Sequence, residues 1–233
     1  MTTLASRIDV TILRQIGPKV TGAPAASQAA VMNGFGDMLP KLLAYMSANS
    51  PLRIQHFLAQ VAHESDGFCT VVEYASGAAY EGRADLGNVN RGDGIRFKGR
   101  GPIQLTGRAN YRTFTEWMRS IQPDCPDFER RPELVADWPW AGWAAAYFWM
   151  TRGLNKLADR DDLVGITKVI NGNGGKVVGT AKHPINTPDL SSFILQAQGA
   201  MPDVIALANG GADTINAIKQ FAEFGGASSG SKL

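Results

Sequence analysis

The stretch FLAQVAHESDGF, from Phe57 to Phe68, decides the fold class because it carries the clearest helical pattern of the sequence. Ser50 and Pro51 precede it as an N-cap and a proline in the first helical turn. Apolar residues then recur at the i, i+3, i+4, i+7 spacing of one helix face: Ile54, Phe57, Leu58 and Val61. Gly67 ends the pattern. We therefore predict an amphipathic helix whose last residues include an acid, Glu64.

Glu64 lies at the edge of the apolar face rather than opposite it. Partial burial raises the pKa of a carboxyl group and keeps it protonated near neutral pH, which makes it a proton donor. The alternative is a solvated glutamate near a helix end. A zinc site is excluded, because the second histidine of a zinc-protease helix would have to stand where Gly67 does. Glu64 is thus a candidate general acid.

A second carboxylate, Glu73, follows the helix at the start of a glycine-rich loop. Hydrolysis of a glycosidic bond needs two carboxyl groups, one to protonate the leaving oxygen and one to activate water or attack carbon. Three other acids of the loop compete for the second role: Glu81, Asp85 and Asp93. Spacing alone leaves that choice open.

The segment KGRGPIQLTGRANY, from Lys98 to Tyr111, closes this loop. Its glycines permit close backbone approach, and Gln104 and Thr106 can hold a water or a sugar hydroxyl. A phosphate-binding loop is not predicted, because Arg100 and Gly101 stand where that motif needs Lys and Ser or Thr. We expect neither a cofactor nor a metal.

The same loop carries a basic run. Its members are Arg91, Arg96, Lys98 and Arg100. The run fits a solvated loop face, and the alternative is contact with an anionic polymer. The net charge of +2 is small for a nucleic-acid binder, so we expect no nucleic-acid partner.

The rest of the chain predicts a mainly α protein with at most one short β-hairpin in the loop. Further helices are expected at 27–46 with a possible kink at Pro40, from Ile103 through Met118, at 141–150 as a buried central helix, at 163–170, and at 213–224. We predict a single domain over 1–225, with 176–225 of uncertain architecture and 226–233 as a flexible tail.

No stretch resembles an export signal or a membrane span, so we expect synthesis in the cytoplasm, no membrane insertion and a monomer. The final Ser-Lys-Leu matches a peroxisomal address, which we interpret as coincidence in a flexible tail. The two cysteines, Cys69 and Cys125, are too few for a disulfide scaffold, and the sequence leaves their pairing open.

Five blocks in order along the chain resemble glycoside hydrolase family 19, which holds chitinases and phage endolysins. They are FLAQVAHES at 57–65, VVEYASG around Glu73, KGRGPIQLTGRANY, RRPELVADWPWAGWAAAYFWM at 130–150 and VINGNGG at 169–175. The family-like core is expected at about 27–175. The resemblance implies a lysozyme-like fold and hydrolysis with inversion by two glutamates without a cofactor.

The resemblance also implies roles for single residues. Glu64 matches the family's general acid, Glu73 its general base, and Thr106 would help to hold the attacking water. Substrate contacts are implied for Gln104, Asn110, Tyr111 and Asn171. The sequence departs from the family in two ways. No arginine that braces the acid is found after the VINGNGG turn. The loop from Glu73 to Gly99 is shorter than in many endolysins, and Glu81 lies close enough in it to rival Glu73 as the base.

The sequence therefore predicts an inverting hydrolase of β-1,4-linked N-acetylhexosamine polymers, acting at the cell wall after release by a route that it does not encode. We favour peptidoglycan over chitin, because a mildly basic protein suits an anionic wall. The rival from another class is a wall-polysaccharide binding protein without catalysis, and a nucleic-acid binder is the weaker alternative.

Overall fold

The computed structural model describes residues 4–170, 179–184, 187–202, 205 and 212–224. Contacts between Cα atoms divide the chain into two compact units, residues 1–156 and 157–233. A division by contacts does not test whether the two units fold independently, so the single domain over 1–225 stays a prediction. The two units are described separately below.

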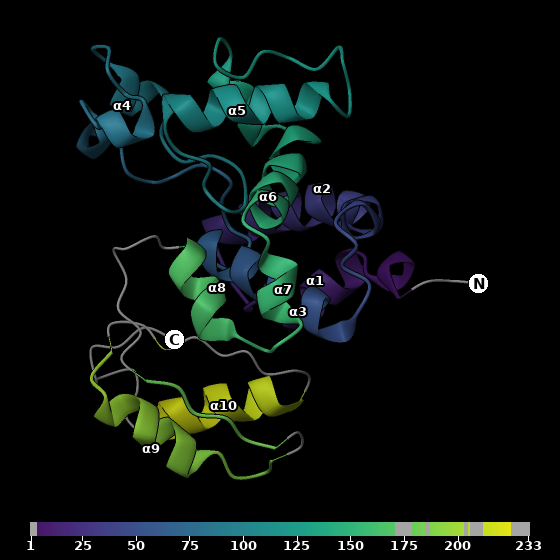
Figure 1. Cartoon of the computed structure of the whole chain (residues 1–233). Helices are drawn as coiled ribbons and strands as arrows, with labels where there is room; N and C mark the ends of the chain where they lie inside the picture. The colour runs from purple at the N-terminus through teal and green to yellow at the C-terminus, as the bar shows by residue number, and fades with distance from the viewer. Residues whose placement is uncertain (1–3, 171–178, 185–186, 203–204, 206–211, 225–233) are drawn as a thin grey trace. The chain divides into compact units, whose positions relative to one another are not determined.

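The first unit is built from helices joined by long loops (Figure 1). In chain order its elements are η1 (Ala5–Arg7), α1 (Val10–Ile16), α2 (Ala23–Tyr45), α3 (Pro51–Glu64), η2 (Ala78–Tyr80), η3 (Ala84–Leu86), α4 (Asp93–Arg96), α5 (Arg108–Arg119), η4 (Pro132–Ala136) and α6 (Trp140–Thr151). The helix α7 (Leu154–Ala158) crosses the boundary between the units. The mainly α prediction is confirmed.

Aromatic side chains of α2, α3 and α6 form the core of the first unit. The ring centroid of Phe57 on α3 lies 6.1 Å from that of Phe35 on α2 and 5.2 Å from that of Trp149 on α6, and all three side chains are fully buried. Burying an aromatic side chain of this kind contributes about 1.5 to 3 kcal/mol. The helix that ends in Glu64 is thus anchored on both sides.

Helix α3 matches the prediction at its start, where the Ser50 hydroxyl accepts a hydrogen bond from Arg53 N at 3.3 Å and Pro51 follows. Helix α2 contains Pro40 as predicted but begins at Ala23, earlier than expected, because Pro24 is accommodated in its first turn.

The helix predicted from Ile103 begins only at Arg108. Gly101, Gln104 and Gly107 have φ values of 77°, 52° and 93°, so the chain turns repeatedly before α5 can start. Among the described residues the predicted hairpin is reduced to two isolated antiparallel bridges, Val72 with Arg100 and Arg100 with Leu105.

The second unit contains α8 (Leu163–Ile170), α9 (Ser191–Gly199) and α10 (Ala212–Glu223). The helices α9 and α10 share a small core of Leu190, Ile194, Ala217 and Phe221. The predictions for α8 and α10 are confirmed to within a residue, whereas α9 was not predicted.

Two further observations bear on the sequence expectations. Cys69 and Cys125 are both buried and free. No helix within the described ranges is long and apolar enough to cross a membrane.

Candidate active site

The turn after α3 fixes the direction in which Glu64 leaves the helix. Ser65 is fully buried, and its hydroxyl donates to Val61 O at 2.6 Å while it accepts from Phe68 N at 3.1 Å. Three successive residues, Asp66, Gly67 and Phe68, then have positive φ values between 53° and 67°. This left-handed turn reverses the chain immediately behind the helix.

Glycine is required in this turn for steric reasons as well. A Cβ atom on Gly67 would collide with the ring of Pro18. Gln28 of α2 donates from one side-chain nitrogen to Gly67 O and Pro18 O, at 2.8 Å each. The end of α3 is therefore held against the segment before α2 by both packing and hydrogen bonds.

Glu64 is the last residue of α3 and its carboxyl group is largely withdrawn from water. Its Oε1 atom is buried and has no hydrogen-bond partner among the described residues. Burial raises the pKa of Glu64 above its ordinary value of 4.5, and the positive charge that His63 can carry lowers this pKa to a smaller extent. A carboxyl group in this state tends to keep its proton, as a general acid must.

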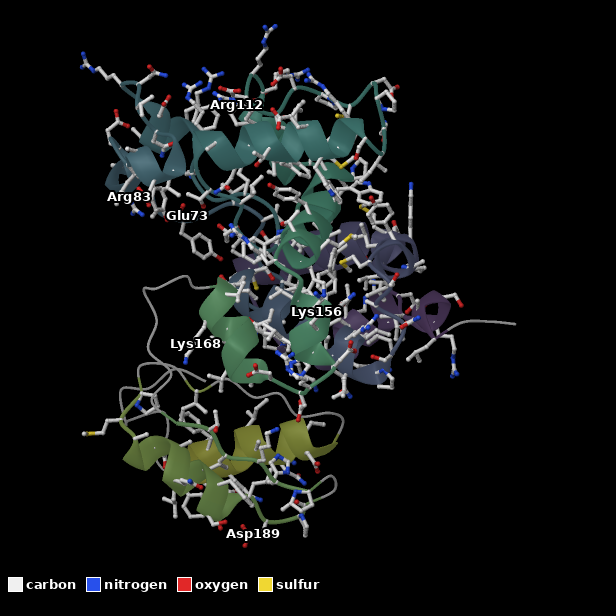
Figure 2. All side chains as sticks on the ribbon, in the orientation of Figure 1. Glu73, Arg83, Arg112, Lys156, Lys168 and Asp189 are labelled. Atoms are coloured by element: carbon white, nitrogen blue, oxygen red, sulfur yellow. The ribbon has the colours of Figure 1, made fainter. Side chains whose placement is uncertain are left out.

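Glu73, which is labelled in Figure 2, has different surroundings, because two donors hold its carboxylate. Tyr80 donates its hydroxyl hydrogen to Oε1 at 2.8 Å, and Gly99 N donates to Oε2 at 2.9 Å. Each carboxylate oxygen has about two acceptor sites, so each retains capacity for a water molecule. These two hydrogen bonds fix the direction in which the carboxyl oxygens of Glu73 point.

Gly99 brings Glu73 and Gln104 together. A Cβ atom on Gly99 would lie 2.6 Å from Gln104 Oε1 and 3.2 Å from Glu73 Oε2. The two polar side chains therefore converge on Gly99, and a larger residue at this position would displace the end of the Gln104 side chain. Gln104 is itself positioned by a hydrogen bond of 2.9 Å from its Nε2 to Gly101 O.

Thr106 and Asn110 continue this polar segment. The Thr106 hydroxyl donates to Gln104 O at 2.8 Å, and Asn110 Nδ2 donates to Thr106 O at 2.7 Å. Since the Thr106 hydrogen is already used, its oxygen can only accept a hydrogen bond from a water molecule. Such an acceptor can orient water beside a carboxylate base, which is compatible with the predicted role.

Tyr111 is fully buried. Its hydroxyl donates to Lys98 O at 2.8 Å and accepts from Arg100 Nη1 at 2.9 Å, and burial raises its pKa to about 12. These contacts tie α5 to the Lys98–Gly101 segment. Contact of Tyr111 with substrate stays a prediction, as does that of Asn171, which lies outside the described residues.

The rival acids are engaged elsewhere on the loop. Glu81 accepts hydrogen bonds from Gly92 N at 2.5 Å and Gly94 N at 2.8 Å, so its carboxylate clamps the start of α4. Asp85 pairs with Arg83, and the buried Asp93 pairs with Arg108. Glu81 carries one hydrogen bond on each carboxyl oxygen, as Glu73 does, so these contacts leave the choice between Glu73 and Glu81 as a prediction.

Three of the four cations of the basic run donate hydrogen bonds to backbone carbonyl oxygens. Arg96 donates to Arg130 O at 2.8 Å, Lys98 donates to Glu73 O at 3.0 Å, and Arg100 donates to Arg96 O at 2.9 Å. These cations hold the loop together instead of presenting a uniform surface to a polyanion. These contacts favour the interpretation of the run as a solvated face of the loop over contact with an anionic polymer.

Two residues of the site were missed by the sequence analysis. Tyr80 was passed over although it follows Glu73 within the same loop, and Asn88 gave no signal at all. Asn88 is fully buried, donates to Tyr80 O at 2.9 Å and accepts from Arg108 N at 2.9 Å. It thus links the residue that holds Glu73 to the first turn of α5.

Comparison with known families gives two matches. The family model described as chitinase class I, from glycoside hydrolase family 19, matches residues 46–176, which is more than half of the chain. A model described as periplasmic binding protein matches residues 153–233, about a third of the chain, which is too little to show a family.

Two curated proteins are similar to parts of this chain. A glycosyl hydrolase family 19 domain-containing protein of Haemophilus influenzae is 31% identical over 101 residues, 43% of this chain and 45% of that protein. An acidic endochitinase of Solanum chilense is 31% identical over 113 residues, 48% of this chain and 40% of that protein. The chain thus matches less than half the length of each relative.

Among solved structures, chitinase C from Streptomyces griseus aligns at 19% identity with a TM-score of 0.47, covering 85% of this chain and 84% of that one.

Proposed function

Because this chain belongs to glycoside hydrolase family 19, we propose that it is a glycosidase that cleaves β-1,4 bonds of N-acetylhexosamine polymers, with Glu64 as general acid and Glu73 as general base. The observation that carries the proposal is the contrast between the two carboxyl groups. Glu64 is partly buried and its buried Oε1 atom has no hydrogen-bond partner among the described residues, whereas Glu73 is held by two donors.

The proposed reaction is a single displacement. The protonated Glu64 donates its hydrogen to the glycosidic oxygen while the bond from that oxygen to the anomeric carbon breaks. Glu73 accepts a proton from a water molecule, whose oxygen forms the new bond to the same carbon from the opposite face. Thr106 would accept the second hydrogen of this water, and Gln104 would contact the sugar.

This mechanism inverts the anomeric configuration and leaves one proton on Glu73 and none on Glu64, so proton exchange with solvent restores the site. An inverting pair needs carboxyl groups about 6.5 to 9.5 Å apart, with room for water between them. Proton NMR of the first product tests the stereochemistry directly. The α anomer supports the mechanism, and initial release of the β anomer would rule it out.

For the substrate we propose peptidoglycan at the bacterial cell wall. The net charge of +2 favours approach to an anionic wall. The second candidate is chitin, which is favoured by the names of the relatives, since an acidic endochitinase and a chitinase C are among the similar proteins.

One experiment separates these candidates. Turbidity loss of bacterial cells stripped of their outer membrane is measured beside release of sugar ends from colloidal chitin, for the wild type and for Glu64→Gln, Glu73→Gln and Glu81→Gln. The proposal of a peptidoglycan hydrolase is supported if Glu64→Gln and Glu73→Gln abolish clearing of the cells and Glu81→Gln does not. Cleavage of chitin alone keeps the chemistry and changes the substrate. Binding of either polymer without cleavage favours the binding-protein alternative.

A further inference from the structure

A hydrogen bond joins the two chain segments that carry the candidate acid and base. Tyr74 immediately follows Glu73, and Asp66 lies two residues after Glu64. The hydroxyl of Tyr74 donates to Asp66 Oδ2 at 3.0 Å. This hydrogen bond therefore links the turn after α3 to the residue that follows Glu73, and it holds the polar end of the phenol ring.

The ring itself is open to solvent, which is unusual for a side chain whose hydroxyl is already bound. Tyr74 is 74% exposed, whereas Tyr45 is 39% exposed and packs edge-on against Trp117 and Trp143. Within the described part of the chain, no other aromatic ring packs against Tyr74. An exposed apolar ring costs free energy in water, and a ligand that covers it recovers that free energy.

From this arrangement we propose that the Tyr74 ring is a stacking platform for one pyranose ring of the glycan, and that Asp66 holds the platform in position. The inference rests on the proposed function, because it takes the substrate to be a sugar polymer. The C–H groups on one face of a β-linked pyranose make that face apolar, so it suits the face of an aromatic ring.

Tyrosine is well suited to such a role. It offers a large rigid contact surface with few rotatable bonds, and one polar end that can be anchored. The anchor at Asp66 restricts the ring before the substrate arrives, so less conformational entropy is lost on binding. Asp66 and Tyr74 lie two residues and one residue beyond the candidate acid and base in the chain, so the platform belongs to the same two segments as the proposed catalytic pair.

The contact could instead serve only to tie the two segments together. The two roles are separable, because the tie needs the hydroxyl and the platform needs the ring. Tyr74→Phe removes the hydrogen bond and keeps the ring. Tyr74→Trp enlarges the ring, and Tyr74→Ala removes both. Val89→Ala is a matched control, since Val89 is another exposed apolar side chain of the same loop, at 69% exposure.

The test measures kcat and KM of the full chain on N-acetylglucosamine hexamer and on purified peptidoglycan for these four variants. It also measures binding of each substrate in a Glu64→Gln background, where cleavage is blocked. We expect Tyr74→Ala to raise KM and the dissociation constant about tenfold with kcat changed less than about threefold. Tyr74→Phe and Tyr74→Trp keep a ring but lose the anchor at Asp66, so we expect KM to rise about threefold in each, whereas Val89→Ala should stay within about twofold of the wild type.

Thermal unfolding of each variant shows that the fold is intact. The platform is overturned if Tyr74→Ala has the KM of Val89→Ala while the wild type cleaves glycan, and in that case the proposed function stands. It is also overturned if Tyr74→Phe is as weak as Tyr74→Ala, because the hydroxyl would then matter and not the ring. A wild type that neither binds nor cleaves either polymer overturns the platform and the proposed function together.

Discussion

The end of α3 and the loop that begins at Glu73 place a glutamate in opposite surroundings. The Glu64 carboxyl is withdrawn from water and its Oε1 atom has no hydrogen-bond partner among the described residues, while the Glu73 carboxylate accepts hydrogen bonds from Tyr80 and Gly99. Desolvation favours the neutral form of the Glu64 carboxyl group, whereas the two donors at Glu73 fix the orientation of its carboxyl oxygens. This difference in environment is the basis on which we propose an acid role for one glutamate and a base role for the other.

Removing the acid should have the largest effect. Glu64→Gln keeps the size of the side chain but has no proton to donate to the leaving oxygen, so we expect kcat/KM to fall about 1000-fold. Initial rates on the better of the two polymers measure this. A variant that keeps more than about a tenth of the wild-type activity would show that another group supplies the proton.

Removing the base should come next. Glu73→Gln should lower kcat about 100-fold, because the amide cannot accept a proton from water. Glu81→Gln serves as the matched control, since its carboxylate contacts only backbone groups at Gly92 and Gly94 in the described loop. Its activity should stay within about threefold of the wild type. A reversal of these two results would transfer the base role to Glu81.

Loosening the base should have a smaller effect. Tyr80→Phe removes the hydrogen bond to Glu73 Oε1, and a hydrogen bond to a charged group contributes about 1.5 to 3 kcal/mol. We expect kcat to fall about tenfold with KM nearly unchanged. An equal loss in Glu73→Gln and in the double variant with Tyr80→Phe would confirm that Tyr80 acts through Glu73. Additive losses would indicate separate roles.

The raised pKa of Glu64 also predicts how stability depends on pH. Between the ordinary value of 4.5 and the raised value, the folded state binds more protons at Glu64 than the unfolded state does. Stability contributed by this group is therefore present below pH 4.5 and is lost as pH rises through the raised pKa.

Glu64→Gln has no carboxyl group to ionise, so it does not lose stability as pH rises through the pKa of Glu64. Its melting temperature should exceed that of the wild type at pH 8 and should match it at pH 4, as measured by calorimetry. A melting temperature of Glu64→Gln below that of the wild type at pH 8 would argue against a desolvated carboxyl. The outcome separates activity from stability, because the same substitution should abolish one and increase the other.

The smallest expected effect concerns His63. Its positive charge lowers the pKa of Glu64, so His63→Ala should raise that pKa further. Activity needs Glu64 protonated, and the alkaline limb of the kcat/KM profile should therefore move to higher pH. His63→Gln is the control of similar polarity and should move the limb in the same direction. A shift to lower pH would contradict the assignment of this limb to Glu64.

The sequence predicts the part of the site that depends on local pattern. The helix from Pro51 to Glu64 could be inferred because its N-cap, proline and apolar spacing act within a few turns, and the position of Glu64 follows from that helix. The start of α5 could not, because the turns at Gly101, Gln104 and Gly107 depend on packing, including the approach of Gly101 to Ala144 of α6.

The supporting contacts of Glu73 depend on residues far apart in the chain. Gly99 lies 26 positions from Glu73, and Asn88 acts on Tyr80 and on Arg108 at once. No local periodicity encodes such contacts, so sequence reasoning left Glu73, Glu81, Asp85 and Asp93 as alternatives. The structure shows which backbone groups and side chains each carboxylate contacts, and Glu73 as the base stays a prediction.

The measurement that tests the central contrast most directly is a carbon-13 NMR titration of the glutamate carboxyl groups, with Glu64→Gln used to assign the Glu64 resonance. Our account predicts that this resonance titrates with a midpoint clearly above the ordinary 4.5 in the wild type. A midpoint at or below 4.5 would show that Glu64 is solvated and ionised at neutral pH, and would contradict its role as the proton donor.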